Sequence, residues 1–119
     1  MVVAVAAAWA GASPAWAEAR LALVIGNADY QHVRDLARPV DDAQAIGAAL
    51  GGLDFQVTKV NNGGKAQIEA AVAGFAAKLK AAGPDAVSFF YYAGHGGAFS
   101  GGGNYLLPVD GAAPDARSI

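Results

Sequence analysis

The sequence predicts an α/β domain built on a mostly parallel sheet, and three observations carry that prediction. Strand-like segments alternate with amphipathic helical segments in the order strand, helix, strand, helix, strand. The first and third strand-like segments are apolar on both faces, which is typical of strands covered by helices from both sides. The chain has 119 residues, which is the usual size of a single domain.

The first half of this pattern holds one strand and one helix. Residues 20–25 form a short, continuously apolar strand, and the polar residues 26–38 follow it as an irregular segment. Pro39 predicts the beginning of a helix, and Gly51 and Gly52 predict its end. The apolar face of this helix comprises Val40, Ala43, Ile46, Gly47 and Leu50.

The second half holds two strands and one helix. Residues 55–60 alternate apolar and polar side chains, which predicts a half-exposed strand. Residues 65–82 form a helix, and residues 86–92 form an aromatic-rich strand followed by a glycine-rich loop over residues 93–104. Pro108 confines the extended piece at residues 105–109 to an edge. The predicted apolar stripe of the helix comprises Ile68, Val72, Phe75 and Leu79.

The connections between these elements predict how the strands are arranged. Right-handed crossovers place the two helices on the sheet faces. A strand order of 2-1-3 makes the first and third strands neighbours, so the loops after Ile25 and Tyr92 meet at one crevice. Because three strands and two helices leave much of a sheet uncovered, we expect a domain that is incomplete at its C-terminus. The free edge of the third strand is expected to be prone to pairing.

Residues 1–17 have the layout of a secretory signal peptide. They contain no charged side chain, and the apolar run from Val2 to Ala10 is shorter than the roughly 20 residues that span a membrane. Ala15-Trp16-Ala17 is a small-x-small triplet, which predicts cleavage after Ala17. We therefore expect an exported protein, periplasmic or extracellular, with its domain in residues 18–119. The alternative is an alanine-rich helix or a disordered leader, since no basic residue follows Met1.

The composition excludes several kinds of chemistry. The chain contains no cysteine, which rules out disulfides, a thiolate metal site and a cysteine nucleophile within these residues. Its net charge is −2 and it has no long basic stretch, so no nucleic-acid partner is expected. The dinucleotide fingerprint, the phosphate loop and the paired-histidine zinc motif are all missing, so no cofactor or metal is expected.

His95 is the residue best placed for catalysis. It stands between Gly94 and Gly96, which lack side-chain bulk and let backbone N–H groups approach a bound carbonyl. A histidine so placed can act as general base or acid near neutral pH, and the N–H of Gly96 or Gly97 can stabilise an oxyanion. The alternative is a structural histidine in a flexible turn.

Two further charged residues, Asp42 and Arg38, are candidates that also have a purely structural explanation. Asp42 stands at the start of a predicted helix, where an acidic side chain stabilises the helix dipole, and Arg38 is explained as a solvated surface charge.

Four segments, in this order and spacing, resemble bacterial caspase-like peptidases of the peptidase C14 and metacaspase group. Together they extend over nearly all of residues 20–110, and their combination is specific although each alone is weak. The segments are Leu21–Tyr30 (LALVIGNADY), Leu36–Ala43 (LARPVDDA), Phe89–Gly96 (FFYYAGHG) and Asn104–Asp110 (NYLLPVD).

The resemblance implies a caspase–haemoglobinase-like three-layer sandwich and cysteine-type endopeptidase activity through a Cys–His dyad. His95 matches the catalytic histidine and Gly96 the backbone donor of the oxyanion hole. Asp42 matches the acid that binds a basic residue before the scissile bond, which implies cleavage after Arg or Lys. Arg38 stands where many relatives have Asn and near the arginine with which true caspases bind aspartate, so basic and acidic preferences both stay open.

The nucleophile of the family lies on the strand that follows the Asn104–Asp110 motif. The sequence holds no cysteine, so we expect the nucleophile to be lost by truncation and the chain to be inactive alone. The expected partner of the complete enzyme is a peptide or protein substrate. The alternative is a non-catalytic caspase-like module that holds peptides in the same crevice or regulates another protein.

Overall fold

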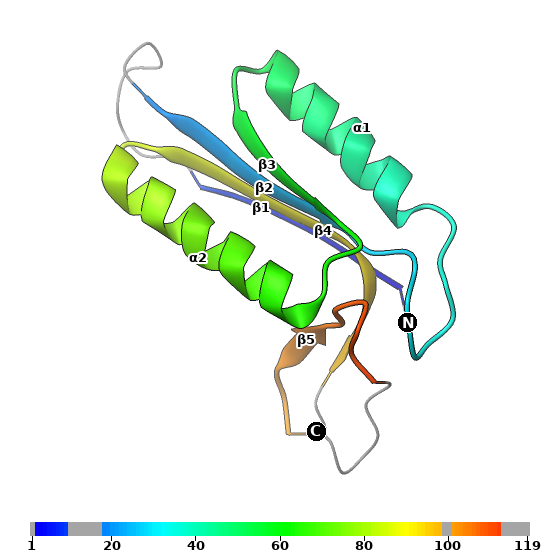
Figure 1. Cartoon of the computed structure of the whole chain (residues 1–119). Helices are drawn as coiled ribbons and strands as arrows, with labels where there is room; N and C mark the ends of the chain where they lie inside the picture. Colours follow the sequence, from blue (N-terminus) through cyan, green and yellow to red (C-terminus); the bar gives the residue numbers. More distant parts are fainter. Residues whose placement is uncertain (1, 10–17, 99–100, 113–119) are drawn as a thin grey trace.

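The computed structural model describes residues 2–9, 18–98 and 101–112. Within these residues, five strands form a sheet and two helices pack on it (Figure 1). The elements in chain order are β1 (Val2–Trp9), β2 (Arg20–Gly26), α1 (Pro39–Gly52), β3 (Gln56–Asn61), α2 (Lys65–Ala82), β4 (Val87–Ala98) and β5 (Asn104–Leu106).

The strands are arranged in the order β1-β4-β2-β3, and β5 pairs with β4. The three strands expected from the sequence are β2, β3 and β4, and β2 is parallel to both of the others. Their predicted order, with the first strand between the second and third, is confirmed. β1 and β5 are antiparallel to β4, so the sheet is mixed.

β2 is the centre of the core because helices cover both of its faces (Figure 1). Ala22 and Val24 point to α1, where they pack with Ala43 and Leu50. The alternate residues on β2 point to α2 and join a second apolar cluster with Tyr92 of β4. The apolar residues from Ala22 to Ile25 of β2 therefore pack against helices on both faces of the sheet.

The predicted apolar stripe of α2 is wrong at Val72. This side chain is 46% exposed, whereas Ala71 packs against the sheet between Ile68 and Phe75. Both stripes have helical spacing, so the sequence pattern alone did not separate them.

β4 is longer than the sequence predicts. It continues through His95 to Ala98, where a glycine-rich loop was expected from Ala93 onward. The extension forms because β5 pairs antiparallel with the last residues of β4, Gly96 standing opposite Leu106. His95 therefore lies within a strand, and residues 99–100 of the predicted loop lie outside the described residues.

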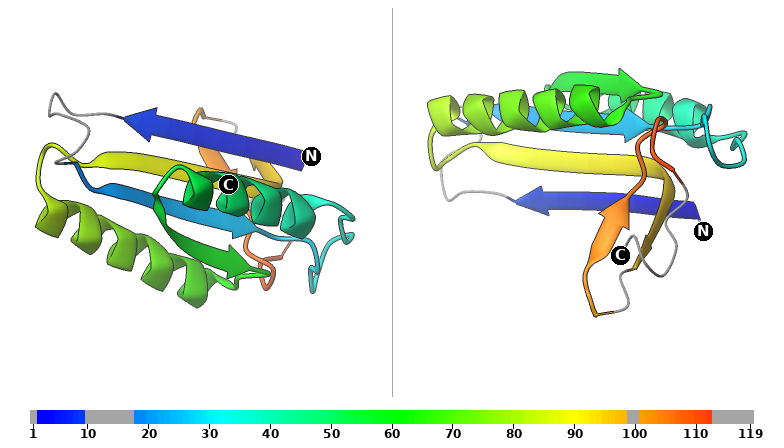
Figure 2. Two further views of the ribbon diagram at one scale, coloured as in Figure 1. Left: turned by 90° about the horizontal axis from the view of Figure 1, so that it is seen from above. Right: turned by 60° about the horizontal axis from the view of Figure 1, so that its bottom comes forward.

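β1 comes from the segment predicted as a signal peptide. It runs antiparallel along the outer edge of β4, with Val2 opposite His95 (Figure 2). The β4 edge that was expected to be free is therefore covered in this structure. The cleavage site after Ala17 lies outside the described residues, and the signal peptide stays a prediction. Neither of the helices in the described part of the chain has the length and apolarity needed to cross a bilayer.

Candidate functional site

The candidate site lies where β2 ends beside the middle of β4. Gly26 at the end of β2 pairs with Ala93, and the Asn27 N–H donates to the Ala93 carbonyl at 2.9 Å. The beginning of α1 approaches the same point, because a Cβ on Gly26 would stand only 2.5 Å from the Pro39 carbonyl oxygen. This close contact brings the residues at the start of α1 to the carboxyl ends of the parallel strands, where α/β sheets bind ligands.

The imidazole of His95 is oriented by a backbone carbonyl. Its Nε2 lies 2.7 Å from the carbonyl oxygen of Arg34, and the ring is half-buried. A carbonyl only accepts hydrogen bonds, so this contact requires the proton on Nε2 and, in the neutral ring, leaves the lone pair on Nδ1. The Tyr30 ring stands edge-on to the imidazole, with 4.7 Å between ring centroids.

The backbone of His95 is held by two buried tyrosines. Its N–H donates to the Tyr30 hydroxyl at 2.7 Å, and its carbonyl accepts from the Tyr92 hydroxyl at 2.6 Å. The N–H of Leu107 donates to the same carbonyl at 3.0 Å. Burial, and secondarily a hydrogen bond with Tyr30, raises the pKa of the Tyr92 hydroxyl, which keeps it neutral and able to donate.

Gly96 is buried in the ladder between β4 and β5. A Cβ at this position would stand 2.9 Å from both the Tyr105 carbonyl oxygen and a methyl carbon of Val3. The position therefore tolerates only glycine without a shift of its surroundings. Since Val3 belongs to β1, the segment predicted as a leader lies directly against the predicted oxyanion donor.

Asp42 and Arg38 line one cavity of about 360 Å³ together with Ala93, two residues before His95. The side chains of both are exposed. The pKa of Tyr91 is raised by burial and, to a lesser degree, by the charge of Asp42. The structure thus gathers the predicted substrate-binding residues beside the strand of His95. The other residues around the cavity are Val2, Val3, Ala4, Leu36, Ala37 and Pro39.

Asp42 also fits its alternative explanation, that of a helix-start acid. It stands in the first turn of α1 with Asp41, and Arg38 is the N-cap residue without a side-chain capping bond. An acidic side chain here stabilises the helix dipole whether or not it binds a substrate. The two roles are compatible because the side chain is exposed to the cavity.

The polar contacts that hold the loops of the site together were not predicted from the sequence. Asn27 is fully buried, accepts from the Gly63 N–H at 2.9 Å and donates to the Leu107 carbonyl at 3.3 Å. Asn62, in the left-handed backbone region with φ of 54°, accepts from the N–H groups of Ala28 and Asp29. The only signal was the position of both asparagines directly beyond or near strand ends.

Asp110 caps a distant helix. Its Oδ1 accepts from the Lys65 N–H at 2.9 Å, at the beginning of α2, where Gly64 has no side chain to do so. A Cβ on Gly64 would stand 2.9 Å from the other carboxylate oxygen. The last described segment of the chain is thereby fastened to α2.

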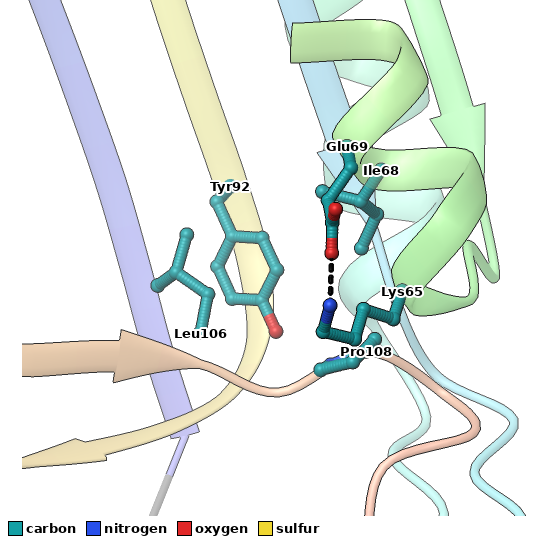
Figure 3. Close-up of a pocket in the computed structure, with 6 residues that line it drawn as sticks. All are labelled: Lys65, Ile68, Glu69, Tyr92, Leu106 and Pro108. Carbon is teal, nitrogen blue, oxygen red and sulfur yellow. Dashed lines mark hydrogen bonds and ion pairs between the residues drawn. The ribbon is translucent and has the colours of Figure 1, made fainter.

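A second cavity, of about 250 Å³, lies between α2 and the segment after β5 (Figure 3). Lys65 and Glu69 form an ion pair at its side, and this pair raises the pKa of the Lys65 ammonium group. Tyr92 also borders this cavity, and its hydroxyl donates to the His95 carbonyl. Nowhere in the described segments do three potential metal-ligating side chains gather. The cavity is lined by Lys65, Ile68, Glu69, Tyr92, Leu106 and Pro108.

The fold and this site define an α/β protein with an oriented histidine within β4, just beyond the carboxyl end of the neighbouring strand β2. The model of the caspase domain family, Peptidase C14, matches residues 19–118. The chain therefore belongs to the caspase domain family, which is a family of cysteine endopeptidases that act on proteins. A search of curated proteins found no match.

Proposed function

We propose that this chain is the histidine-bearing part of an exported, bacterial, metacaspase-like cysteine endopeptidase whose complete domain is a three-layer sandwich. The observation that carries the proposal is the contact between His95 Nε2 and the Arg34 carbonyl. This contact leaves Nδ1 as the proton acceptor of the neutral ring. The family match supports peptide-bond hydrolysis as the reaction.

The proposed mechanism uses a cysteine from outside these residues, since the sequence contains none. Nδ1 of His95 takes the thiol proton, and the thiolate attacks the scissile carbonyl carbon. The Gly96 N–H stabilises the oxyanion, and His95 returns the proton to the leaving amine as the C–N bond breaks. Water then hydrolyses the thioester with His95 as base. The chain of 119 residues alone is expected to show no turnover.

We propose that the enzyme cleaves after Arg or Lys. The support is the exposed Asp42 carboxylate in the first turn of α1, at a cavity that it shares with Ala93 of β4. The β1 residues that close this cavity on one side would leave with the predicted leader, which opens the carboxylate to substrate. A guanidinium or ammonium group there pairs with the carboxylate. Arg38 borders the same cavity and is the residue that would favour an acidic side chain instead. Replacing Asp42 by Asn is therefore expected to weaken cleavage after Arg and Lys and to spare cleavage after Asp.

The nucleophile is proposed to arrive on a strand that pairs with the outer edge of β4. β1 occupies that edge here, with Val2 opposite His95. Because β1 lies within the predicted signal peptide, cleavage after Ala17 would clear the edge next to His95. N-terminal sequencing of the secreted protein is expected to find Glu18 as the first residue. A mature protein that retains Val2 would contradict this part of the proposal.

The decisive experiment uses the protein from a longer reading frame that carries this sequence and a cysteine on the following apolar strand. Its hydrolysis of reporter peptides ending in Arg, Lys or Asp is measured. His95→Ala is expected to lower the rate about 10²–10⁴-fold, as loss of a general base does. His32→Ala is the matched control, because His32 is the other of the two histidines and lies exposed in a loop. Activity that survives His95→Ala would refute the proposal.

A non-catalytic peptide-binding or regulatory module is the second candidate, and the exposed Asp42 carboxylate at a cavity supports it, because binding a basic side chain there needs no nucleophile. Such a module would hold Arg or Lys peptides at Asp42 without cutting them. Binding of these peptides by the longer protein, lost in Asp42→Asn and accompanied by no hydrolysis, would support this second function over the first.

A further inference from the structure

We infer that Tyr30 and Tyr92 are positioning residues for His95, because their hydroxyls close a ring of hydrogen bonds around its backbone. The inference rests on the proposed role of His95 as the catalytic base. In this arrangement, the two hydroxyls hold the main chain of His95, and the Arg34 carbonyl holds its imidazole.

The ring of hydrogen bonds has a defined direction. The His95 N–H donates to the Tyr30 hydroxyl oxygen at 2.7 Å, because an amide can only donate. The Tyr92 hydroxyl donates to the His95 carbonyl at 2.6 Å, because a carbonyl can only accept. The Tyr92 hydroxyl also lies 3.1 Å from the Leu107 carbonyl, the longer of its two carbonyl contacts. Its one hydrogen is therefore directed to backbone carbonyls, and the contact of 3.5 Å between the two hydroxyls is donated by Tyr30. The peptide groups on both sides of the His95 Cα are thereby fixed.

The ring of hydrogen bonds explains why residue 94 is a glycine. A Cβ at this position would stand 2.6 Å from both the Tyr30 and the Tyr92 hydroxyl oxygens. The two hydroxyls therefore occupy the space that any other side chain would need. Gly94 lies within β4 and shows no positive φ, so close approach and not a turn requires this glycine.

The loop between β2 and α1 couples this ring to the imidazole. The Tyr30 N–H donates to the Asp35 carboxylate at 2.8 Å, which closes the segment between them into a tight loop. Arg34, whose carbonyl holds the imidazole Nε2, stands next to Asp35 in this loop. Tyr30 thus touches the His95 backbone through its hydroxyl and the imidazole through its ring, while its own loop supplies the orienting carbonyl.

The test removes one hydroxyl at a time from the full chain of 119 residues. Tyr30→Phe and Tyr92→Phe each open the ring and keep the aromatic side chain. Tyr91→Phe is the matched control, because it makes the same change one residue away on β4, among side chains that pack toward α1. Amide hydrogen exchange of His95 and the ¹⁵N shifts of its imidazole are measured by NMR, with His32 as the internal reference.

In Tyr30→Phe and Tyr92→Phe, we expect His95 amide exchange to be about tenfold faster, the equivalent of one lost hydrogen bond. The imidazole signals are expected to move from the pattern of an Nε2–H ring toward a mixture of tautomers. Tyr91→Phe is expected to leave both unchanged. If Tyr92→Phe does not fold, Tyr30→Phe decides the result.

An unchanged imidazole spectrum in Tyr30→Phe overturns the inference, even if the melting temperature falls, because a merely structural hydroxyl gives that result. Equal changes in Tyr91→Phe also overturn it. The measurement needs no nucleophile, so it is independent of the peptidase assay. A longer protein without activity would refute the proposed function and leave the positioning result standing.

Discussion

β2 and β1 are the two extremes of packing in this sheet. β2 is hydrogen-bonded on both sides and covered by a helix on each face, and Leu23 at its centre is 0% exposed. β1 pairs with β4 along one edge, its described side chains alternate between exposed and half-buried, and Val2 is 60% exposed. The difference shows that the core is organised around β2, whereas β1 contributes at the margin, where Val5 packs against the cluster that contains Leu23.

The largest expected effect comes from a cavity at the centre of the sheet. Leu23→Ala is expected to lower the free energy of unfolding by about 2–5 kcal/mol, because a fully buried leucine leaves a cavity that its neighbours fill only in part. Val5→Ala in β1 is the matched control, with an expected loss of about 1 kcal/mol or less. Urea unfolding followed by circular dichroism measures both. Equal losses would show that β1 belongs to the core.

A smaller effect is expected at Asn27, just beyond β2. Asn27→Ala leaves the Gly63 N–H without its acceptor in a buried place, which costs about 1–3 kcal/mol. The Leu107 carbonyl loses the Asn27 amide but keeps the Tyr92 hydroxyl. Asn61→Ala, at an exposed position on β3, is expected to change stability little. The same unfolding measurement compares the two. A neutral Asn27→Ala would mean that the polar contacts do not extend the β2 core into the site.

The smallest effect is expected at the outer margin, where Asp110 caps α2. Asp110→Ala is expected to cost about 1 kcal/mol, since the Lys65 N–H loses its acceptor at a helix N-terminus. Asp110→Asn keeps an acceptor oxygen and is expected to retain most of that stability. Thermal unfolding monitored by circular dichroism measures the difference. Equal losses in the two variants would point to the charge of Asp110 instead of its hydrogen bond.

The sequence predicted the central elements well because their signals are local. The apolar run at residues 20–25 predicted a buried strand, and the spacing of the apolar residues in α1 predicted which face of the helix packs on the sheet. The errors have one cause, which is that a distant segment decided the outcome. β5 extended β4 through His95, β1 covered the β4 edge that was expected to be free, and α2 packs Ala71 instead of Val72 against the sheet.

The candidate site divides in the same way. The motifs located His95, Gly96, Asp42 and Arg38, and the structure brings them to the ends of neighbouring strands. The contact that orients His95 spans 61 residues and ends on a backbone carbonyl, which every residue possesses. Because every residue has a backbone carbonyl, residue identity does not indicate which one contacts the imidazole, and the role of the Arg34 carbonyl could not be predicted.

By itself, the sequence determined the alternation of strands and helices, the family motifs and the absence of a thiol, because each depends on residue identity at near neighbours. Only the tertiary structure decided which imidazole nitrogen carries the proton and which hydroxyls hold the His95 backbone. It also decided that the predicted leader segment lies along the β4 edge. These are contacts between groups far apart in the chain, and their geometry exists only once β2, β4 and the loops beyond them have packed together.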